Sequence, residues 1–447
     1  MKKASLLTLF LIVFIDLIGF GILLPNQQYY GEIFGIHNTF FLVLIGPAYS
    51  LCQFLFAPIL GKWSDRAGRR PVLILSQIGT LVGFLLLFGA HFLVPVNQGL
   101  AIFLLYFSRV LDGISGGNIS IASAYIADIT TPENRAKGMG VIGAAFGIGF
   151  VFGPFIGGLV GSSKHLGLPY VPVAAALFSA AALLLTIFTL PESHHPGEAS
   201  PEGLRRYNAA SIFHTLVRPI IGMLILMSFV NGFAFAGMEQ TFSLLIQQRA
   251  YATLTASNPI EAAKAASGAC GYLFGGIGII IALVQGGLIG RLTKAFGEAA
   301  LAITGPIIIA AGLVIVGSAG IWIPVWTAFI FGSACLALGS SLFTPSIQSL
   351  VSRHASNKEQ GEVLGAFQGM ASFARGAGPL LAGALFAYVW VNSRFAGSAP
   401  YFVSAALCIV VSLWALTMRT RIKPPAVESA PAPAANMEPS PDKQTPA

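Results

Sequence analysis

Charged residues are scarce in this sequence. Asp, Glu, Lys and Arg together make up 9% of its 447 residues, whereas a soluble domain carries about 25%. Hydrophobic residues reach 55%, and the mean hydropathy is +0.77. So apolar a chain cannot cover a water-facing surface with polar groups, and most of its surface must face lipid. The composition excludes an ordinary soluble domain and predicts an integral membrane protein.

Cysteine is also scarce, and the four cysteines show no paired spacing. Each lies within an apolar stretch, which gives neither a disulfide framework nor a set of metal ligands. We therefore expect Cys52, Cys270, Cys335 and Cys408 to pack as small apolar side chains. No metal and no other bound cofactor is expected.

Long apolar runs are abundant, and their lengths predict membrane-spanning helices, which need about 20 apolar residues each. The first run, residues 5–24, is longer than the roughly 7–15 residues of a signal-peptide core, and it carries Asp16 in its middle. We interpret it as a spanning helix. The predicted spans cover residues 5–24, 40–60, 71–92, 100–127, 137–161, 169–190, 219–247, 268–290, 299–319, 323–351, 362–389 and 399–418.

A polar stretch divides these spans into two groups of six. The fold prediction is an all-α membrane protein with twelve transmembrane helices in two pseudo-symmetric six-helix bundles. An amino-terminal bundle, a cytoplasmic central loop, a carboxy-terminal bundle and a disordered cytoplasmic tail are predicted at residues 1–190, 191–217, 218–418 and 419–447. The tail is rich in Pro and Ala and holds no apolar run.

Removal of the tail after Lys423 is expected to leave the activity of the protein intact, because no apolar periodicity ties these residues to the bundles. The truncated and full-length proteins would be compared for membrane insertion and for activity. A truncated protein that reaches the membrane but is inactive would contradict the expectation.

Positive charges lie mostly on one side of the predicted membrane. With both termini placed in the cytoplasm, the inner segments hold most of the 25 Lys and Arg residues. The outer segments hold only Lys164, Arg249, Lys264 and Arg394. This distribution follows the positive-inside rule. It predicts a multi-pass protein of the cell (inner) membrane with cytoplasmic termini, and it explains the net charge of +8 without a nucleic-acid partner.

The two halves repeat short glycine motifs. Segments 61–68 and 290–297 both begin and end in glycine, and they follow the second and eighth spans. A Gly-Pro pair with a further glycine occurs at 153–158 in the fifth span and at 378–383 in the eleventh. Paired halves of six spans are the architecture in which a central cavity forms between two bundles.

Several motifs resemble those of a known superfamily. The segment Gly61-Lys-Trp-Ser-Asp-Arg-Ala-Gly-Arg-Arg-Pro71 resembles the loop 2–3 signature of major facilitator transporters. Arg109 with Asp112-Gly113 resembles their fourth-helix motif. The run Gly149-x-x-x-Gly153-Pro154-x-x-Gly157-Gly158 resembles the fifth-helix motif of the drug–proton antiporters in that superfamily.

Two longer segments, 125–158 and 348–379, are similar to bacterial tetracycline–proton antiporters. The third and ninth spans contain no acidic residue, whereas the tetracycline exporters carry one in each. The resemblance therefore implies a major facilitator fold and drug–proton antiport, and it does not identify tetracycline as the drug.

Ionisable residues inside the spans must face a bundle interior or a wet cavity, because each costs roughly 2.5–3.5 kcal/mol at a helix centre facing lipid. Asp16 lies about 11 residues into its span, roughly 17 Å along the helix and close to the midplane. Partly desolvated there, its carboxylate can bind and release protons near neutral pH. Asp16 is the leading proton-coupling candidate. A permanent ion pair with Arg109 is the alternative.

Arg109 and Asp112 lie three residues apart on one face of the fourth helix. Because Arg109 remains charged, it can bias the proton affinity of an approaching carboxylate. A local Arg109–Asp112 pair that merely neutralises the helix is the alternative, and the resemblance favours a coupling role for Arg109. Asp16, Arg109 and Asp112 form the predicted proton-coupling set.

The candidates for the substrate cavity are Asn118, Glu239, Gln240, Gln368 and Arg375. Glu239 lies about 20 residues into its span, roughly 30 Å along the helix and near the outer interface. A solvated carboxylate at a helix end is therefore as good an interpretation as a substrate or proton site. The sequence shows no acidic neighbour for Arg375.

Residues at the inner ends of the spans predict a cytoplasmic gate. The predicted gate residues are Gly61, Asp65, Arg66, Gly68, Arg69, Arg70 and Asp128. We predict that Arg69 bridges to Asp128, and that Asp65 engages the amino end of the eleventh helix near Gly361 through the helix dipole. The alternative is that these charges are static, serve only to set the membrane topology, and form no gate.

Glycine and proline in the fifth and eleventh spans predict hinges and close helix packing. The residues concerned are Gly149, Gly153, Pro154, Gly157, Gly158, Gly378 and Pro379. A glycine at every fourth position gives one smooth helix face. Packing alone explains this pattern as well as bending does.

The leading functional hypothesis is proton-coupled export of a hydrophobic or amphipathic, drug-like small molecule by alternating access. A nutrient or metabolite symporter or facilitator is the alternative, because the fold alone does not distinguish such a carrier from an exporter. A non-transporting receptor is disfavoured, since buried midplane charges cost stability without serving a partner surface. No G-x-x-x-x-G-K-[ST] phosphate loop occurs, which disfavours ATP-driven pumping. The expected protein is a monomer and not an enzyme, and its partners are the substrate, the proton and the lipid bilayer.

Overall fold

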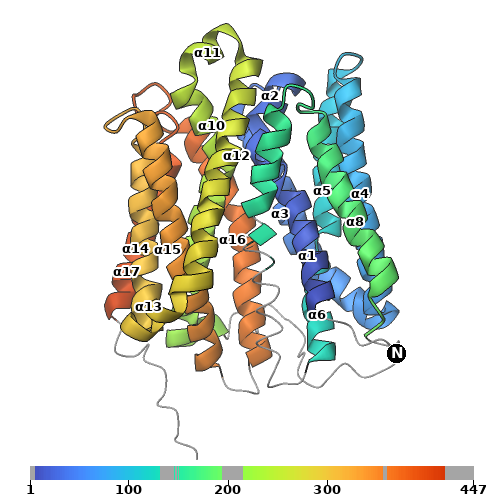
Figure 1. Ribbon diagram of the computed structural model, residues 1–447, viewed down its shortest axis with the longest axis vertical. Coiled ribbons are helices and arrows are strands. Elements are labelled where there is room, and N and C mark those ends of the chain that lie inside the picture. Colours follow the sequence, from blue (N-terminus) through green and yellow to red (C-terminus); the bar gives the residue numbers. More distant parts are fainter. Residues whose placement is uncertain are drawn as a thin grey trace, which may run out of the picture.

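The structure of the chain is a computed structural model that describes residues 6–130, 145, 148–149, 151–193, 215–355 and 360–417 (Figure 1). The helices of the first half are α1 (Leu6–Gly21), η1 (Leu24–Asn26), α2 (Gln27–Phe34), α3 (Thr39–Ala67), α4 (Arg69–Leu93), α5 (Gln98–Ser115), α6 (Asn118–Ile129), the apolar helix Val151–Ser162 and α8 (Tyr170–Thr189). Those of the second half are α10 (Pro219–Ala250), α11 (Ala252–Ser257), α12 (Pro259–Leu283), the π-helical η2 (Val284–Leu288), α13 (Ile289–Phe296), α14 (Glu298–Gly317), α15 (Val325–His354), α16 (Gln360–Tyr388) and α17 (Ala399–Thr417).

The predicted architecture is confirmed. Within the described ranges, eleven helical stretches are long and apolar enough to cross a membrane, and Val151–Ser162 is a shorter apolar helix. Together they follow the predicted spans in order, with the short helix in the place of the fifth. Most of residues 137–150, much of the predicted central loop and the predicted tail lie outside the described residues.

Three spans differ in detail from the sequence prediction. The first continues beyond Pro25, whose missing N–H interrupts the helical ladder, through η1 into α2. The fourth is divided into α5 and α6 at Gly116 and Gly117. The alanine-rich outer segment after Arg249 forms α11 and the first turns of α12. The membrane helices are therefore longer and more segmented than the apolar runs alone indicate.

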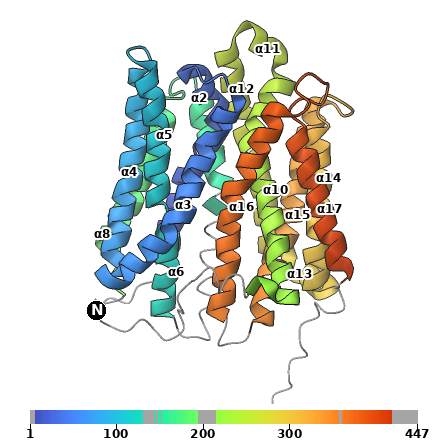
Figure 2. The same cartoon turned by 180° about the vertical axis from the view of Figure 1, so that it is seen from behind.

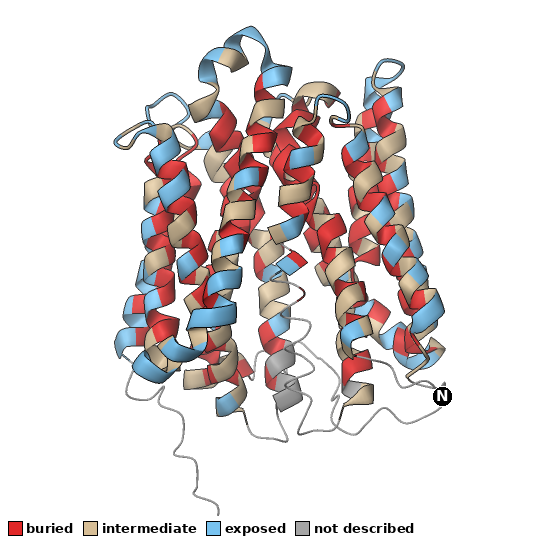
Figure 3. Cartoon of the chain, viewed as in Figure 1, coloured by how far each residue is buried: buried red, intermediate tan, exposed pale blue. Residues whose placement is uncertain are grey.

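Each half encloses its own hydrophobic core. One cluster of buried side chains, from Ile221 to Ala415, lies wholly in the second half. Two clusters lie in the first half, and one of them also takes in two side chains of the second. Large apolar side chains such as Phe103 and Phe331 are instead exposed. Figure 3 shows exposed positions along the flanks of both bundles, as a lipid-facing surface requires.

Glycines bring the fifth span against the first. Gly149, Gly153 and Gly157 all face α1 or the residues that follow it. A Cβ added to Gly153 would lie only 2.7 Å from the Cα of Gly21, which is closer than packed carbon atoms approach. Any larger residue would force the two helices apart, so close packing of this face is confirmed. Its role as a hinge remains a prediction.

The repeated glycines also make equivalent contacts in the two halves. Gly158 of the fifth span lies against α12, where a Cβ would approach the Cα of Gly271 to 2.5 Å. In the second half, Gly378 lies against the backbone of Phe233 in α10, and Gly383 lies against α3. The fifth span thus contacts the first and eighth, while the eleventh contacts the seventh and second. Figure 2 shows α16 passing between α3 and α10.

Candidate functional site

Asp16 lies in the interior of the first half. Nδ2 of Asn118, the first residue of α6, donates a hydrogen bond to Oδ2 of Asp16 at 2.7 Å. The other carboxylate oxygen is buried and makes no hydrogen bond within the described structure. The buried Gln77 amide lies near this carboxylate. The alternative of an Asp16–Arg109 ion pair is not observed among the described residues, because Arg109 pairs elsewhere.

Arg109 forms an ion pair with Asp112 on the same helix. Its Nη1 lies 3.0 Å from Oδ2 of Asp112, and the two side chains are only 3% and 2% exposed. The guanidinium also lies 5.3 Å from the centre of the Phe84 ring, at cation–π distance. Nη2 of Arg109 is buried without a hydrogen bond in the described residues. The pair that the sequence offered as one alternative is therefore present, and its role in coupling stays a prediction.

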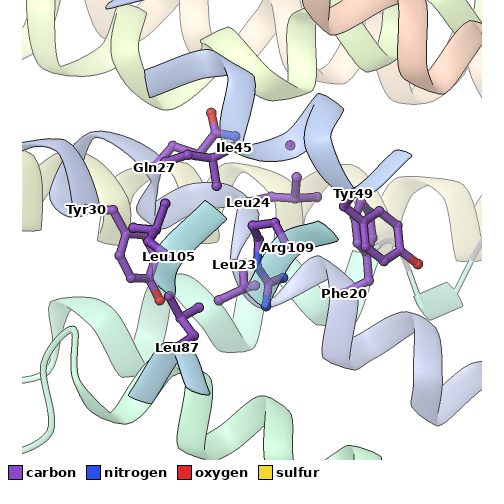
Figure 4. Close-up of a pocket in the computed structure, with 11 residues that line it drawn as sticks. Phe20, Leu23, Leu24, Gln27, Tyr30, Ile45, Tyr49, Leu87, Leu105 and Arg109 are labelled. Carbon is purple, nitrogen blue, oxygen red and sulfur yellow. The ribbon is translucent and has the colours of Figure 1, made fainter. Parts of the chain in front are cut away.

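Two cavities follow each other along the first half. The inner cavity is lined by Val13, Asp16, Leu17, Phe20, Tyr49, Thr80, Phe84, Asp112, Gly116, Asn118 and Ile119. The outer cavity is lined by Phe20, Leu23, Leu24, Gln27, Tyr30, Ile45, Gly46, Tyr49, Leu87, Leu105 and Arg109 (Figure 4).

The boundary between the two cavities is aromatic. Phe20 and Tyr49 line both, and their ring centres lie 4.4 Å apart. Figure 4 shows these two rings together on one side of the outer cavity and the Arg109 side chain reaching into it. Asp112 lines the inner cavity, so the Arg109–Asp112 pair extends from one cavity to the other. An acidic, hydrogen-bonded inner cavity thus lies directly below a mostly apolar outer one.

The remaining cavity candidates do not gather at one point. Asn118 is in the inner cavity and Gln368 is exposed, while Gln240 is bonded to Gln27 of the first half. Glu239 is only 4% exposed, so the interpretation as a solvated carboxylate is wrong. α10 continues to Ala250 and buries this residue among its neighbours. The charge of Arg375 acts on Glu239, which is the acidic neighbour that the sequence did not reveal.

The predicted bridge between Arg69 and Asp128 is confirmed. Nε of Arg69 lies 3.0 Å from Oδ2 of Asp128, and both side chains are buried. Nη1 of Arg69 also binds Asp65 at 2.5 Å and Ser64 at 2.7 Å. The end of the eleventh helix that Asp65 was predicted to engage has side chains outside the described residues. The gating role of this cluster stays a prediction.

The other predicted gate residues surround this cluster. Gly68 has φ +97°, a backbone conformation that favours glycine, and it ends α3. Nη2 of Arg70 donates to the carbonyl of Ile187 at 2.7 Å, and Arg66 is exposed. Gly61 packs against Ser120 of α6. These contacts hold the inner ends of α3, α4, α6 and α8 together.

Two groups of functional candidates were not predicted from the sequence. Glu192 accepts hydrogen bonds from the backbone N–H groups of Arg69 and Arg70, at 2.8 and 3.1 Å, and so caps the start of α4 with a negative charge. The second group is a set of polar residues at the outer end, which includes Gln27 and Ser243. The only signal for it was the polar run that follows the first apolar stretch.

The profile of the Major Facilitator Superfamily matches residues 9–321 and 271–444. The chain therefore belongs to this superfamily and is a multi-pass integral membrane protein. It is 31% identical to the class C tetracycline resistance protein of Escherichia coli over 404 residues, which cover 89% of this chain and 93% of that protein. It is 29% identical to multidrug resistance protein 1 of Bacillus subtilis, covering 92% and 96% of the two chains.

Solved structures agree with this assignment. The human organic anion transporter MFSD10 is similar over 92% of this chain and 98% of its own, with a TM-score of 0.63 and 26% identity. A D-xylose–proton symporter is similar over 95% and 100% of the two chains, with a TM-score of 0.73. Its 15% identity shows a shared fold alone. These proteins are transporters, and the chain is a secondary active transporter of the same superfamily.

Proposed function

We propose that this chain exports a hydrophobic or amphipathic small molecule from the cytoplasm in exchange for entering protons. The observation that carries the proposal is the inner cavity, where Asp16 lies with one bonded and one unbonded carboxylate oxygen in the same space as the Arg109–Asp112 pair. A desolvated carboxylate of this kind gains and loses protons as its surroundings change. The tetracycline and multidrug resistance relatives support export of drug-like compounds.

The cavities also suit the proposed substrate class. The outer cavity is bounded mainly by leucine, isoleucine and aromatic side chains, with few polar groups. Such a lining binds apolar ligands and orients them through the few polar contacts available. We propose that the substrate's apolar part occupies this region, next to the proton site, and that the protein works as a monomer in the inner membrane with cytoplasmic termini and no enzymatic step.

The direction of proton movement tests the proposal. Purified protein would be reconstituted into vesicles that contain a pH-sensitive dye, and candidate substrates would be added against an imposed proton gradient. Export by antiport should move protons in the direction opposite to the substrate. Movement of both in the same direction would support a symporter instead. Substrate transport with no proton movement would contradict coupling altogether.

A further inference from the structure

Four polar side chains line the outer cavity, and three of them keep an atom that has no hydrogen-bond partner in the described part of the chain. These free atoms are Oε1 of Gln27, Oη of Tyr30 and Nη2 of Arg109. Each of the three residues is only 2% exposed. Buried polar atoms are rarely left without a partner in native proteins, so three around one cavity need an explanation. A ligand in the cavity supplies one.

The other polar atoms around the cavity are already engaged. Nη1 of Arg109 lies 3.0 Å from Oδ2 of Asp112, and Nε2 of Gln27 donates to Gln240. Oη of Tyr49, the fourth polar side chain, accepts a hydrogen bond at 2.9 Å from a glutamine of its own helix, α3. The protein therefore satisfies the polar groups of this cavity only in part, and the unsatisfied part consists of three particular atoms.

Two of the free atoms lie on the same side of the cavity. Figure 4 shows the Tyr30 hydroxyl and the Arg109 guanidinium on that side, with the Gln27 amide on the opposite side. The charge of Arg109 acts on the Tyr30 hydroxyl, which places the two groups within electrostatic range of each other. Both groups can donate a hydrogen bond, whereas the free oxygen of Gln27 can only accept one. The cavity thus presents two donors on one side and an acceptor on the other.

Neighbouring aromatic rings fix the two donors in place. The ring of Tyr30 packs against His91 and Phe34, with centre distances of 5.6 and 6.0 Å. The guanidinium of Arg109 lies 5.3 Å from the centre of the Phe84 ring. Groups that are already ordered lose little conformational freedom when a ligand binds. The hydroxyl and the guanidinium are therefore pre-organised for a ligand.

This arrangement selects the chemistry of the ligand. An oxygen with lone pairs, such as a carbonyl oxygen, can accept from both donors, and an N–H or O–H of the same molecule can donate to Gln27. A cationic amine would instead lie beside the like charge of Arg109. An anion would gain little, because Asp112 already neutralises Arg109 and Asp16 lies in the adjoining cavity. A buried charge without a partner is costly, so a neutral acceptor is favoured over either ion.

We propose that the outer cavity binds a neutral amphipathic molecule through an acceptor oxygen, which takes hydrogen bonds from Nη2 of Arg109 and Oη of Tyr30. The leucine and isoleucine side chains of the cavity hold its apolar part. This inference rests on the proposed function, because it treats the bound molecule as the substrate. It makes Tyr30 a specificity-determining residue. Arg109 would hold the substrate through one nitrogen and Asp112 through another.

The test compares four compounds that share a naphthalene ring and differ in one group. Naphthalene itself has no polar atom, naphthamide adds a neutral carbonyl and N–H, naphthoate is an anion, and naphthylmethylamine is a cation near neutral pH. Tritiated naphthamide is bound to purified, immobilised protein in detergent, and the other three compete for it. Partition into detergent is measured without protein and subtracted. Naphthamide should bind about tenfold more tightly than each of the others, or 1.4 kcal/mol.

Two variants locate the contact, and a third is the matched control. Tyr30→Phe removes one donor and keeps the ring, so naphthamide should bind about fivefold more weakly while naphthalene binds as before. Arg109→Lys keeps a positive charge beside Asp112 but lacks the forked guanidinium, and its effect should be similar. Tyr106→Phe removes a hydroxyl that donates to the carbonyl of Phe41 at 2.6 Å, outside the cavity. It should leave all four affinities unchanged.

Three results would overturn the proposal. If Tyr30→Phe weakened naphthalene as much as naphthamide, the hydroxyl would only maintain the shape of the cavity. If naphthoate or naphthylmethylamine bound more tightly than naphthamide, the site would select an ion. If all four compounds bound the unaltered protein equally, water would serve the free atoms. None of these measurements uses a proton gradient, so failure of this site and failure of proton-coupled export are distinguishable.

Discussion

Replacing Asp16 with Asn should abolish uphill export while leaving substrate exchange down a gradient intact. Asn is nearly isosteric and can keep a hydrogen bond to Asn118, but it cannot carry a proton between the two sides. The coupling energy at stake is large. One proton entering with a membrane potential supplies about 2.3 kcal/mol per 100 mV, enough for roughly 50-fold accumulation of a neutral substrate, since 1.4 kcal/mol is a factor of ten. That accumulation should be lost.

The measurement follows proton flux and substrate flux in the same vesicles. Substrate added to the Asp16→Asn protein should produce no proton movement, while labelled substrate still exchanges between the two sides. Asn118→Ala is the matched control, because it removes the bond partner of Asp16 and keeps the carboxylate. It should change the pH dependence of export and retain coupling. Undiminished substrate-driven proton movement by Asp16→Asn would transfer the coupling role to Asp112 or Glu239.

The sequence predicts the spans well because each apolar run is long enough to cross a bilayer on its own. It fails at α2, a helix of eight residues that begins with two glutamines and has no apolar run of its own. It also places Glu239 near the outer interface by counting residues from the start of the span. The structure buries this residue, because α10 is 32 residues long and packs against other helices over most of that length.

The contacts of the candidate site were likewise only partly predicted from the sequence. Arg69 and Asp128 were paired from the sequence, because topology brings the inner ends of adjacent spans together and opposite charges at such ends attract. Asp16 and Asn118 were both named as candidates, but nothing in the sequence joined them, since their contact depends on how α1 crosses α6. The hydrogen bonds between the two halves at the outer end were beyond prediction for the same reason. Their partners lie in different halves, and only the docking of the two bundles brings Asn26 to Ser267.

Replacing Arg69 with Met should destabilise the protein strongly, whereas Asp65→Asn should leave its stability nearly unchanged and slow turnover. Asp128 is 4% exposed and Arg69 is fully buried, so removal of the arginine leaves an unpaired buried charge. Such a loss costs about 3–5 kcal/mol. Asp65 is 44% exposed, and exposed ion pairs contribute only about 0–1 kcal/mol. Loss of the ion pair between Arg69 and buried Asp128 should therefore cost far more stability than loss of the ion pair between Arg69 and exposed Asp65.

Thermal unfolding in detergent and turnover in vesicles separate these effects. Arg69→Met should lower the melting temperature, and Asp128→Asn should lower it less, because Arg69 keeps its ion pair with Asp65 and an amide oxygen can still accept a hydrogen bond from its Nε. Asp65→Asn should bind substrate normally but exchange it slowly, since Asp65 is predicted to act at the inner gate and not in the cavity. Unchanged turnover in Asp65→Asn would show that Asp65 only supports the structure. An unchanged melting temperature in Arg69→Met would mean that water or another cation reaches Asp128, and the cluster would not hold the inner end of the bundle together.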